Sequence, residues 1–246
     1  KDYENEKAFG QWLSKCTKTH KKQGYRSVTF SLKETGRPPG DASSSQMRAV
    51  ANLSNEYSFG EIRVSHEQNL ILADVQEDKL HELWVKAKKY HLVTPNIGLL
   101  TDIICCPGGD FCSLANAKSI PIAESIQELF EDMDYLHDIG DLNLNISGCM
   151  NACGHHHVGH IGILGIDKSG SEWYQVTLGG NQGNFASIGK IIGPSFSAEE
   201  MPLIIKKIIE VYLKHRKEEE IFIDCIKRIG LEPFKDYIYQ KTKVTE

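Results

Sequence analysis

The sequence predicts an α+β protein that is divided into two units. Short segments of alternating apolar residues are separated by segments of helical periodicity, an order typical of helices packed on a mainly antiparallel sheet. A Pro95-Asn96 pair interrupts this pattern, which indicates a boundary. We therefore expect units at residues 1–95 and 96–246, and 40% hydrophobic residues suffice for a core in each.

The first unit is predicted to follow the order strand, helix, strand, strand, helix. Residues 1–24 are polar and basic and indicate a lead-in segment or a short helix. The pair Ser43 and Gln46 has the spacing of a capping box, and the helix that it begins places Met47, Val50, Leu53 and Tyr57 near one face. The other segments with strand or helix periodicity are 26–32, 62–64, 70–73 and 80–87.

The second unit is predicted to contain further strands and helices around most of the cysteines. One strand ends directly before Cys106. Alternating apolar residues predict the other strands at 142–146, 161–164 and 173–178. A second capping-box pair, Ser197 and Glu200, begins a helix. The predicted helices are 111–117, 122–133, 201–212, 219–229 and 232–239.

Charge and hydropathy exclude two classes of partner. The formal net charge is −5, whereas a nucleic-acid-binding domain normally carries a basic stripe. No apolar run approaches the roughly 20 residues needed to cross a bilayer, and the first residues show no signal-peptide pattern. We therefore expect a cytoplasmic protein that binds neither nucleic acid nor a membrane.

The cysteines are the most informative part of the composition. Seven are present, and five of them fall between residues 105 and 153. An odd number without a secretion signal argues against a disulfide framework. Four of them form a C-x5-C pair and a C-x3-C pair: Cys106, Cys112, Cys149 and Cys153. Cys105 points away from its neighbour if the segment is extended, so we expect it in the core.

Four thiolates match the requirement of a [4Fe–4S] cluster, which takes one for each iron. Gly108, Gly109 and Gly148 are small enough for the backbone to approach such a cluster, and backbone N–H groups there can raise its reduction potential. Zinc is the competing metal, because a C-x3-C pair fits a zinc knuckle although a C-x5-C pair does not. Simple packing of small buried thiols is the third interpretation. The spacing favours iron–sulfur and leaves the other two open.

Four histidines follow the second cysteine pair, at positions 155, 156, 157 and 160. Adjacent residues of an extended segment point in opposite directions, so these side chains cannot all converge on one metal. We expect them to be polar surface or hydrogen-bond donors near a site. Contact of one of them with a cofactor carboxylate is the alternative.

Several stretches resemble the sirohaem and [4Fe–4S] motifs of assimilatory sulfite and nitrite reductases. They are Thr-Asp-Ile-Ile-Cys-Cys-Pro-Gly-Gly-Asp-Phe-Cys-Ser-Leu-Ala at 101–115, Ser-Gly-Cys-Met-Asn-Ala-Cys-Gly at 147–154, and the segments 60–70 and 178–181. The histidine-rich segment resembles the bacterial nitrite/sulfite reductase haemoprotein branch. The resemblance covers essentially the whole chain. It implies a ferredoxin-like half-domain at 1–95 and a sirohaem/[4Fe–4S]-binding α+β domain at 96–246.

The same resemblance implies cofactors and a reaction. The four cysteines of the two pairs would bind the cluster, Cys153 would also bridge it to the sirohaem iron as an axial ligand, and Asn151 would be a further cofactor-binding residue. The implied reaction is the six-electron reduction of sulfite to sulfide or of nitrite to ammonia. The electron donor would be ferredoxin or a flavoprotein subunit.

Full members of the family contain two copies of this arrangement, and the chain resembles the second, C-terminal copy. Sirohaem carboxylates and an anionic substrate need Arg and Lys partners, but Lys118 and Lys168 are the basic residues nearest to the cysteines in the sequence. We therefore expect the substrate-binding cations on the N-terminal half of the same polypeptide, assign no catalytic residue here, and expect this chain alone to be inactive. A haem-free iron–sulfur electron-transfer module and a zinc-stabilised binding module are the alternatives.

Overall fold

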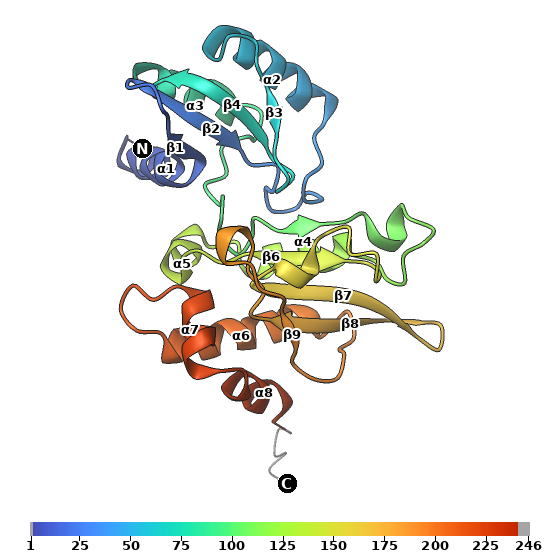
Figure 1. The fold of residues 1–246 in the computed structure, drawn as a ribbon. Coiled ribbons are helices and arrows are strands. Elements are labelled where there is room, and N and C mark those ends of the chain that lie inside the picture. The colour runs from blue at the N-terminus through green and yellow to red at the C-terminus, as the bar shows by residue number, and fades with distance from the viewer. Residues whose placement is uncertain (1, 241–246) are drawn as a thin grey trace. The chain divides into compact units, whose positions relative to one another are not determined.

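The structure, a computed structural model, describes residues 2–240. The chain divides into two compact units, unit 1 at Lys1–Asp102 and unit 2 at Ile103–Glu246. Both units combine helices with a sheet (Figure 1), so the predicted α+β class is confirmed.

Unit 1 is a four-stranded antiparallel sheet packed with three helices (Figure 1). The strand order across the sheet is β1-β2-β4-β3. Its elements are α1 (Asp2–Cys16), β1 (Thr17–Thr19), β2 (Tyr25–Phe30), α2 (Ser44–Tyr57), β3 (Arg63–Val64), β4 (Leu70–Gln76), the 3₁₀ turn η1 (Glu77–Lys79) and α3 (Leu80–Lys88). The predicted strand–helix–strand–strand–helix core is therefore present, with one helix and one strand before it.

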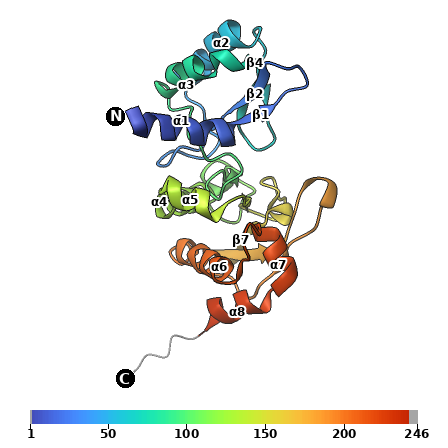
Figure 2. The same ribbon diagram turned by 90° about the vertical axis from the view of Figure 1, so that its left-hand side faces the viewer.

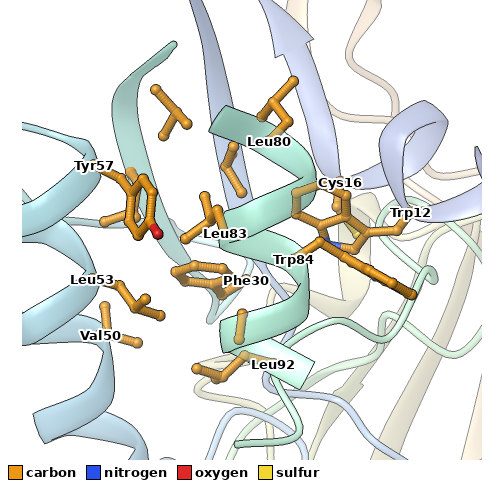
Figure 3. Packing of buried hydrophobic residues seen from close by; sticks show 14 of the residues in the cluster. Trp12, Cys16, Phe30, Val50, Leu53, Tyr57, Leu80, Leu83, Trp84 and Leu92 are labelled. Carbon is orange, nitrogen blue, oxygen red and sulfur yellow. The ribbon is translucent and has the colours of Figure 1, made fainter. Parts of the chain in front are cut away.

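One apolar core joins the sheet and all three helices of unit 1. Figure 3 shows Trp12 of α1, Phe30 of β2 and Leu83 of α3 among the side chains of this core, and all three are fully buried. Burial of this apolar surface is the main force that stabilises the unit. The lead-in segment is therefore a structural part of the unit, because its helix α1 contributes Trp12 to the core.

The helix α2 begins with the predicted capping box. The hydroxyl of Ser43 accepts a hydrogen bond from the backbone N–H of Gln46, and the Gln46 side chain accepts one from the backbone N–H of Ser43. The expectation for Met47 is wrong, because its side chain is 60% exposed. Val50, Leu53 and Tyr57 are buried as expected, and the rest of the buried face is formed by Gln46, Ala49 and Ser54.

The residues after the expected boundary at 95/96 remain attached to unit 1. Asn96 is buried, accepts a hydrogen bond from the Ser31 hydroxyl at 2.7 Å and donates one to the carbonyl of Lys33 at 3.1 Å. The ammonium of Lys33 lies 2.7 Å from a carboxylate oxygen of Asp102. These contacts hold residues 96–102 against the residues that directly follow β2. The division into units therefore falls later than Pro95 indicates.

Unit 2 contains a five-stranded mixed sheet in the order β5-β6-β7-β8-β9. The pairs β5–β6 and β6–β7 are parallel, and the pairs β7–β8 and β8–β9 are antiparallel. The strands are β5 (Ile104–Cys105), β6 (Leu144–Ser147), β7 (Ile161–Lys168), β8 (Ser171–Leu178) and β9 (Lys190–Ile191). The strand predictions for this unit therefore hold, although the short β9 follows from no pattern in the sequence.

The helices of unit 2 are α4 (Ile120–Leu129), α5 (Met133–Ile139), α6 (Met201–His215), α7 (Phe222–Ile229) and α8 (Glu232–Tyr239). The helix α6 contacts α4, α7 and α8 (Figure 2) and buries an apolar face that includes Ile205, Ile208 and Tyr212. Within residues 2–240, no helix is long and apolar enough to cross a membrane.

Two helix expectations in unit 2 need correction. The helix predicted at 111–117 is wrong: this segment consists of turns that follow the 3₁₀ turn η2 (Gly108–Asp110). The helix predicted at 122–133 is two helices, because α4 ends at Leu129 and the side chain of Asp132 caps the start of α5. The carboxylate of Asp132 accepts hydrogen bonds from two backbone N–H groups of α5, which favours a new helix start at that position.

Candidate functional site

The first cysteine of each pair follows a strand of the same sheet. Cys106 comes directly after β5, and Cys149 comes two residues after β6. The two strands are parallel neighbours, so their carboxyl ends lie at one edge. The backbone N–H of Cys106 continues the pairing with a hydrogen bond to the carbonyl of Ile146 at 3.1 Å. The topology therefore brings together cysteines that are 43 residues apart in the sequence.

Hydrogen bonds tie the cysteine loop, defined here as residues 106–119, to the segment after β6. The carbonyl of Gly148 accepts from the backbone N–H groups of Asn116 at 2.8 Å and Ala117 at 3.1 Å. A Cβ at Gly148 would lie 2.6 Å from the carbonyl oxygen of Ala117 and 2.8 Å from the Cα of Gly108. Only glycine leaves enough space for this contact, so Gly148 determines how closely the two cysteine segments approach.

The four predicted cysteine ligands range from buried to exposed. Cys106 and Cys149 are buried, each 8% exposed, whereas Cys112 is partly buried and Cys153 is exposed. Asn151 is exposed in the turn between the last two of these cysteines. All four thiols are free. A group held here would have two ligands inside the protein and would be reached from outside at Cys153.

The thiol of Cys106 is in contact with two hydrogen-bonding groups. The backbone N–H of Gly148 donates to its Sγ at 3.1 Å. The hydroxyl of Ser119 lies 3.5 Å from the same sulfur atom. Cys105, by contrast, is buried in the sheet and its thiol donates to the carbonyl of Cys106 at 3.2 Å. The two adjacent cysteines therefore have different surroundings, as the sequence predicts.

The backbone around Cys153 adopts a sparsely populated conformation. Ala152 has a φ of 57° and His155 has a φ of 54°, and such left-handed conformations cost a residue with a side chain about 1 kcal/mol or more. Between them, Gly154 lies so close to β6 that an added Cβ would be 1.9 Å from the carbonyl oxygen of Ile146. The chain around the exposed thiol is therefore fixed by packing against β6.

The four histidines do not converge, in agreement with the prediction. His155 and His157 are exposed, whereas His156 and His160 are buried. The backbone N–H of Asn143 donates to Nδ1 of His160 at 3.2 Å, so the ring proton of His160 is on Nε2. That nitrogen lies 3.2 Å from Oδ1 of Asn181 and donates to it. Burial lowers the pKa of His160. This histidine is therefore a neutral structural link to the glycine-rich stretch at 178–181.

His156 is the buried histidine with an unsatisfied ring nitrogen. Its side chain is 2% exposed, and its Nδ1 has no hydrogen-bond partner among the described residues. Burial, with the neighbouring His157 ring as a second cause, lowers the pKa of His156 to about 4. A buried polar nitrogen normally has a hydrogen-bond partner. The unsatisfied Nδ1 of His156 is therefore consistent with a hydrogen bond to a bound cofactor.

The arrangement fits a cluster better than a single metal ion. Within the described part of the chain, no three His, Cys, Asp or Glu side chains are close enough together to hold one ion. Zinc would need all four sulfur atoms around one centre, whereas a [4Fe–4S] cluster binds each cysteine through a different iron. The close approach of Gly148 to the cysteine loop and the two hydrogen-bonding partners of Cys106 also fit a cluster ligand.

The two lysines nearest to the cysteines in the sequence have partners within unit 2. Lys118 lies 3.6 Å from a carboxylate oxygen of Asp110, and Lys168 lies over the ring of Trp173 at 4.5 Å. Neither contact is with a cysteine. The sequence did not point to Ser119, although a serine directly before an Ile-Pro pair, with the proline in the first turn, is a pattern typical of a helix start.

Comparisons with known proteins agree with this chemistry. The family described as "Nitrite and sulphite reductase 4Fe-4S domain" matches residues 99–245. The family described as "Nitrite/Sulfite reductase ferredoxin-like half domain" matches residues 21–90. The second match agrees with the ferredoxin-like fold expected for unit 1, and the first covers the cysteine segments of unit 2.

Curated relatives are reductases of both substrate types. The chain is 27% identical over 194 residues to the assimilatory ferredoxin-dependent nitrite reductase of Haloferax mediterranei, covering 76% of this chain and 33% of that protein. It is 28% identical over 211 residues to sulfite reductase [ferredoxin] 2 of Mycolicibacterium paratuberculosis, covering 81% of this chain and 38% of that protein. The chain therefore spans between a third and two fifths of the length of these relatives.

Two solved structures have a similar fold. The Mycobacterium tuberculosis NirA protein aligns with a TM-score of 0.71 and 26% identity, over 89% of this chain and 40% of that one. Dissimilatory sulfite reductase I also aligns with a TM-score of 0.71, over 88% of this chain and 69% of that one. Because the second identity is 12%, that likeness concerns the fold alone.

Proposed function

This chain belongs to the nitrite and sulphite reductase 4Fe-4S domain family, and we propose that it forms the cluster-bearing part of a sulfite or nitrite reductase. The observation that carries the proposal is the position of the first cysteine of each pair at one edge of the sheet, where hydrogen bonds to Gly148 tie the cysteine loop to the segment after β6. The overall reaction is a six-electron reduction, of sulfite to sulfide or of nitrite to ammonia.

In this proposal the chain binds two cofactors. When bound, the cluster would store and pass single electrons, and sirohaem would supply the iron on which the oxyanion is reduced. Cys106, Cys112, Cys149 and Cys153 would each bind one iron of the cluster. Cys153 has the exposed thiol of the four, which supports a second role as the bridge to the sirohaem iron. Asn151, in the same turn, would be a further cofactor-binding residue.

The remaining parts of the reaction would come from outside this chain. The lysines nearest to the cysteines already pair with Asp110 or stack on Trp173, which supports our proposal that the cations for substrate and sirohaem lie on an N-terminal half of the same polypeptide. Two of the relatives depend on ferredoxin by name. We therefore propose a ferredoxin as electron donor, with a flavoprotein subunit as the other candidate.

The experiment is a cofactor analysis of the purified holoprotein with a matched pair of variants. We expect about five irons for every four acid-labile sulfides, because sirohaem adds one iron to the four of the cluster. We also expect a tetrapyrrole absorption spectrum and reduction of sulfite or nitrite by a reduced dye. Cys106→Ala removes a proposed ligand and should abolish the cluster. Cys105→Ala removes the adjacent buried thiol, which donates a hydrogen bond to the carbonyl of Cys106. This variant should keep the cluster.

Three results would overturn or narrow the proposal. One zinc per chain without iron would indicate a structural zinc module. Iron and sulfide without tetrapyrrole would indicate a haem-free electron-transfer module. Equal loss of the cluster in both variants would contradict the assignment of Cys106 over Cys105.

A further inference from the structure

Ser119 occupies the start of helix α4 without capping it. A serine at this position normally accepts a hydrogen bond from one of the next backbone N–H groups of the helix. Ser119 makes no such bond: its backbone is not extended (φ −109°, ψ −39°), and Pro121 in the first turn lacks an N–H group. Its side chain is completely buried. The hydroxyl therefore has a partner other than the helix that begins after it.

That partner is the sulfur of Cys106, at 3.5 Å from the Ser119 oxygen. In a free thiol either group could donate the hydrogen bond. Once Cys106 binds iron as a thiolate, its sulfur carries no proton, so the serine hydroxyl is the donor. Together with the N–H of Gly148 at 3.1 Å, this places two donors on one ligand sulfur. The positive end of the α4 dipole lies at the same place, because Ser119 precedes its first turn.

We infer that Ser119 is a positioning residue that raises the reduction potential of the cluster through its hydrogen bond to Cys106. The inference rests on the proposed function, because it requires the cluster. An electron added to the cluster increases the negative charge on the ligand sulfurs. A hydrogen-bond donor therefore stabilises the reduced state more than the oxidised state, and this raises the potential.

A purely structural role makes a different prediction. The serine side chain also fills the space beside Gly108 and Gly148, where an added Cβ would lie 2.7 Å and 3.0 Å from its hydroxyl oxygen. If packing were its whole contribution, replacing the hydroxyl by hydrogen would change stability and cluster content. The potential of the clusters that remain would be unchanged.

The test is an EPR-monitored redox titration of the loaded holoprotein and its Ser119→Ala variant. We expect the variant to have a lower potential, with the ratio of reduced to oxidised cluster at a fixed potential falling by up to about tenfold, or about 59 mV for a one-electron couple. Ser119→Thr keeps the hydroxyl and should restore the potential. Ser125→Ala is the matched control, because this serine lies on α4 but bonds to the carbonyl of Ile122 at 2.9 Å.

An unchanged potential in Ser119→Ala with an intact cluster would overturn the inference, as would an equal shift in Ser125→Ala. If Ser119→Ala does not assemble the cluster, Ser119→Cys decides the question, because a thiol is a weak donor: we expect a lowered potential, and a wild-type value would contradict us. Absence of any cluster in the wild-type holoprotein would instead refute the proposed function. The two failures are therefore distinguishable.

Discussion

At the residue scale, the most deeply buried charges of unit 1 are an ion pair near its carboxyl end. The side chains of Lys33 and Asp102 are 0% and 6% exposed. The Lys33 ammonium also donates to the carbonyl of Glu67 at 2.7 Å. The carboxylate accepts further hydrogen bonds from the Asn69 side chain at 3.0 Å and from the backbone N–H of Gly98 at 3.0 Å. Such satisfied networks fix one arrangement of the chain.

Replacing one member of this pair should destabilise unit 1 strongly. Lys33→Met leaves the Asp102 carboxylate buried without its cation, which typically costs about 3–5 kcal/mol. The loss is measured as the change in the free energy of unfolding in urea. The control is Lys235→Met, which breaks the exposed pair with Glu232 and should cost about 1 kcal/mol or less. Equal losses in the two variants would show that burial of the pair has no energetic consequence.

At the element scale, the cysteine loop depends on contacts that the sequence does not reveal. The periodicity of 111–117 predicts a helix, yet the structure has turns there, because Asn116 and Ala117 donate their N–H groups to Gly148. Those bonds join residues more than 30 positions apart. The local periodicity of a sequence cannot predict such long-range hydrogen bonds. The cysteine spacing, by contrast, identified the segment itself.

The sequence predicted the elements with clear apolar periodicity better than those without it. The β4 and α3 segments carry strong periodicity and were found where expected. The three-residue strand β1 has no pattern of its own and exists through its pairing with β2. The orientation of Ser119 was equally unpredictable, since a helix-start serine usually caps its helix and its contact with Cys106 depends on the tertiary fold.

A methyl group at Gly148 should separate the two cysteine segments. In Gly148→Ala the new Cβ would overlap the carbonyl of Ala117 and the backbone of Gly108, and such overpacking costs about 1–3 kcal/mol. We expect lower stability and loss of most bound iron, measured by urea unfolding and iron analysis. Gly10→Ala is the control, because an alanine at this position of α1 meets no atom within 4 Å and should leave the iron content unchanged. Full iron content in Gly148→Ala would contradict the proposed role of Gly148.

At the scale of the whole molecule, the charge of the chain argues for a partner segment. The net charge is −5, whereas sirohaem and the proposed oxyanion substrate are both negative, and convergent cations are needed to bind such groups. Unit 2 places thiols at its sheet edge. We therefore propose that this chain contributes the cysteines that bind the cofactors, and that the other half contributes the cations that bind the substrate and the sirohaem carboxylates.

The chain of residues 1–246 should not reduce sulfite or nitrite when it is purified without the other half. We expect no turnover above the background of the reduced dye, while the holoprotein is active under the same conditions. Adding a separately expressed N-terminal half should restore activity if the two halves assemble. Turnover by this chain alone would contradict the assignment of the substrate-binding cations to another segment.

The close packing of glycines beside β6 and β7 also limits how this part of the protein can change over evolution. An added Cβ would lie 1.9 Å from a carbonyl oxygen at Gly154 and 2.1 Å from one at Gly162. A substitution at either position therefore fails for lack of space, whatever the chemistry of the site. A descendant that had lost its cysteines would still need both glycines, because they maintain the fold, whereas the cysteines are the proposed cofactor ligands.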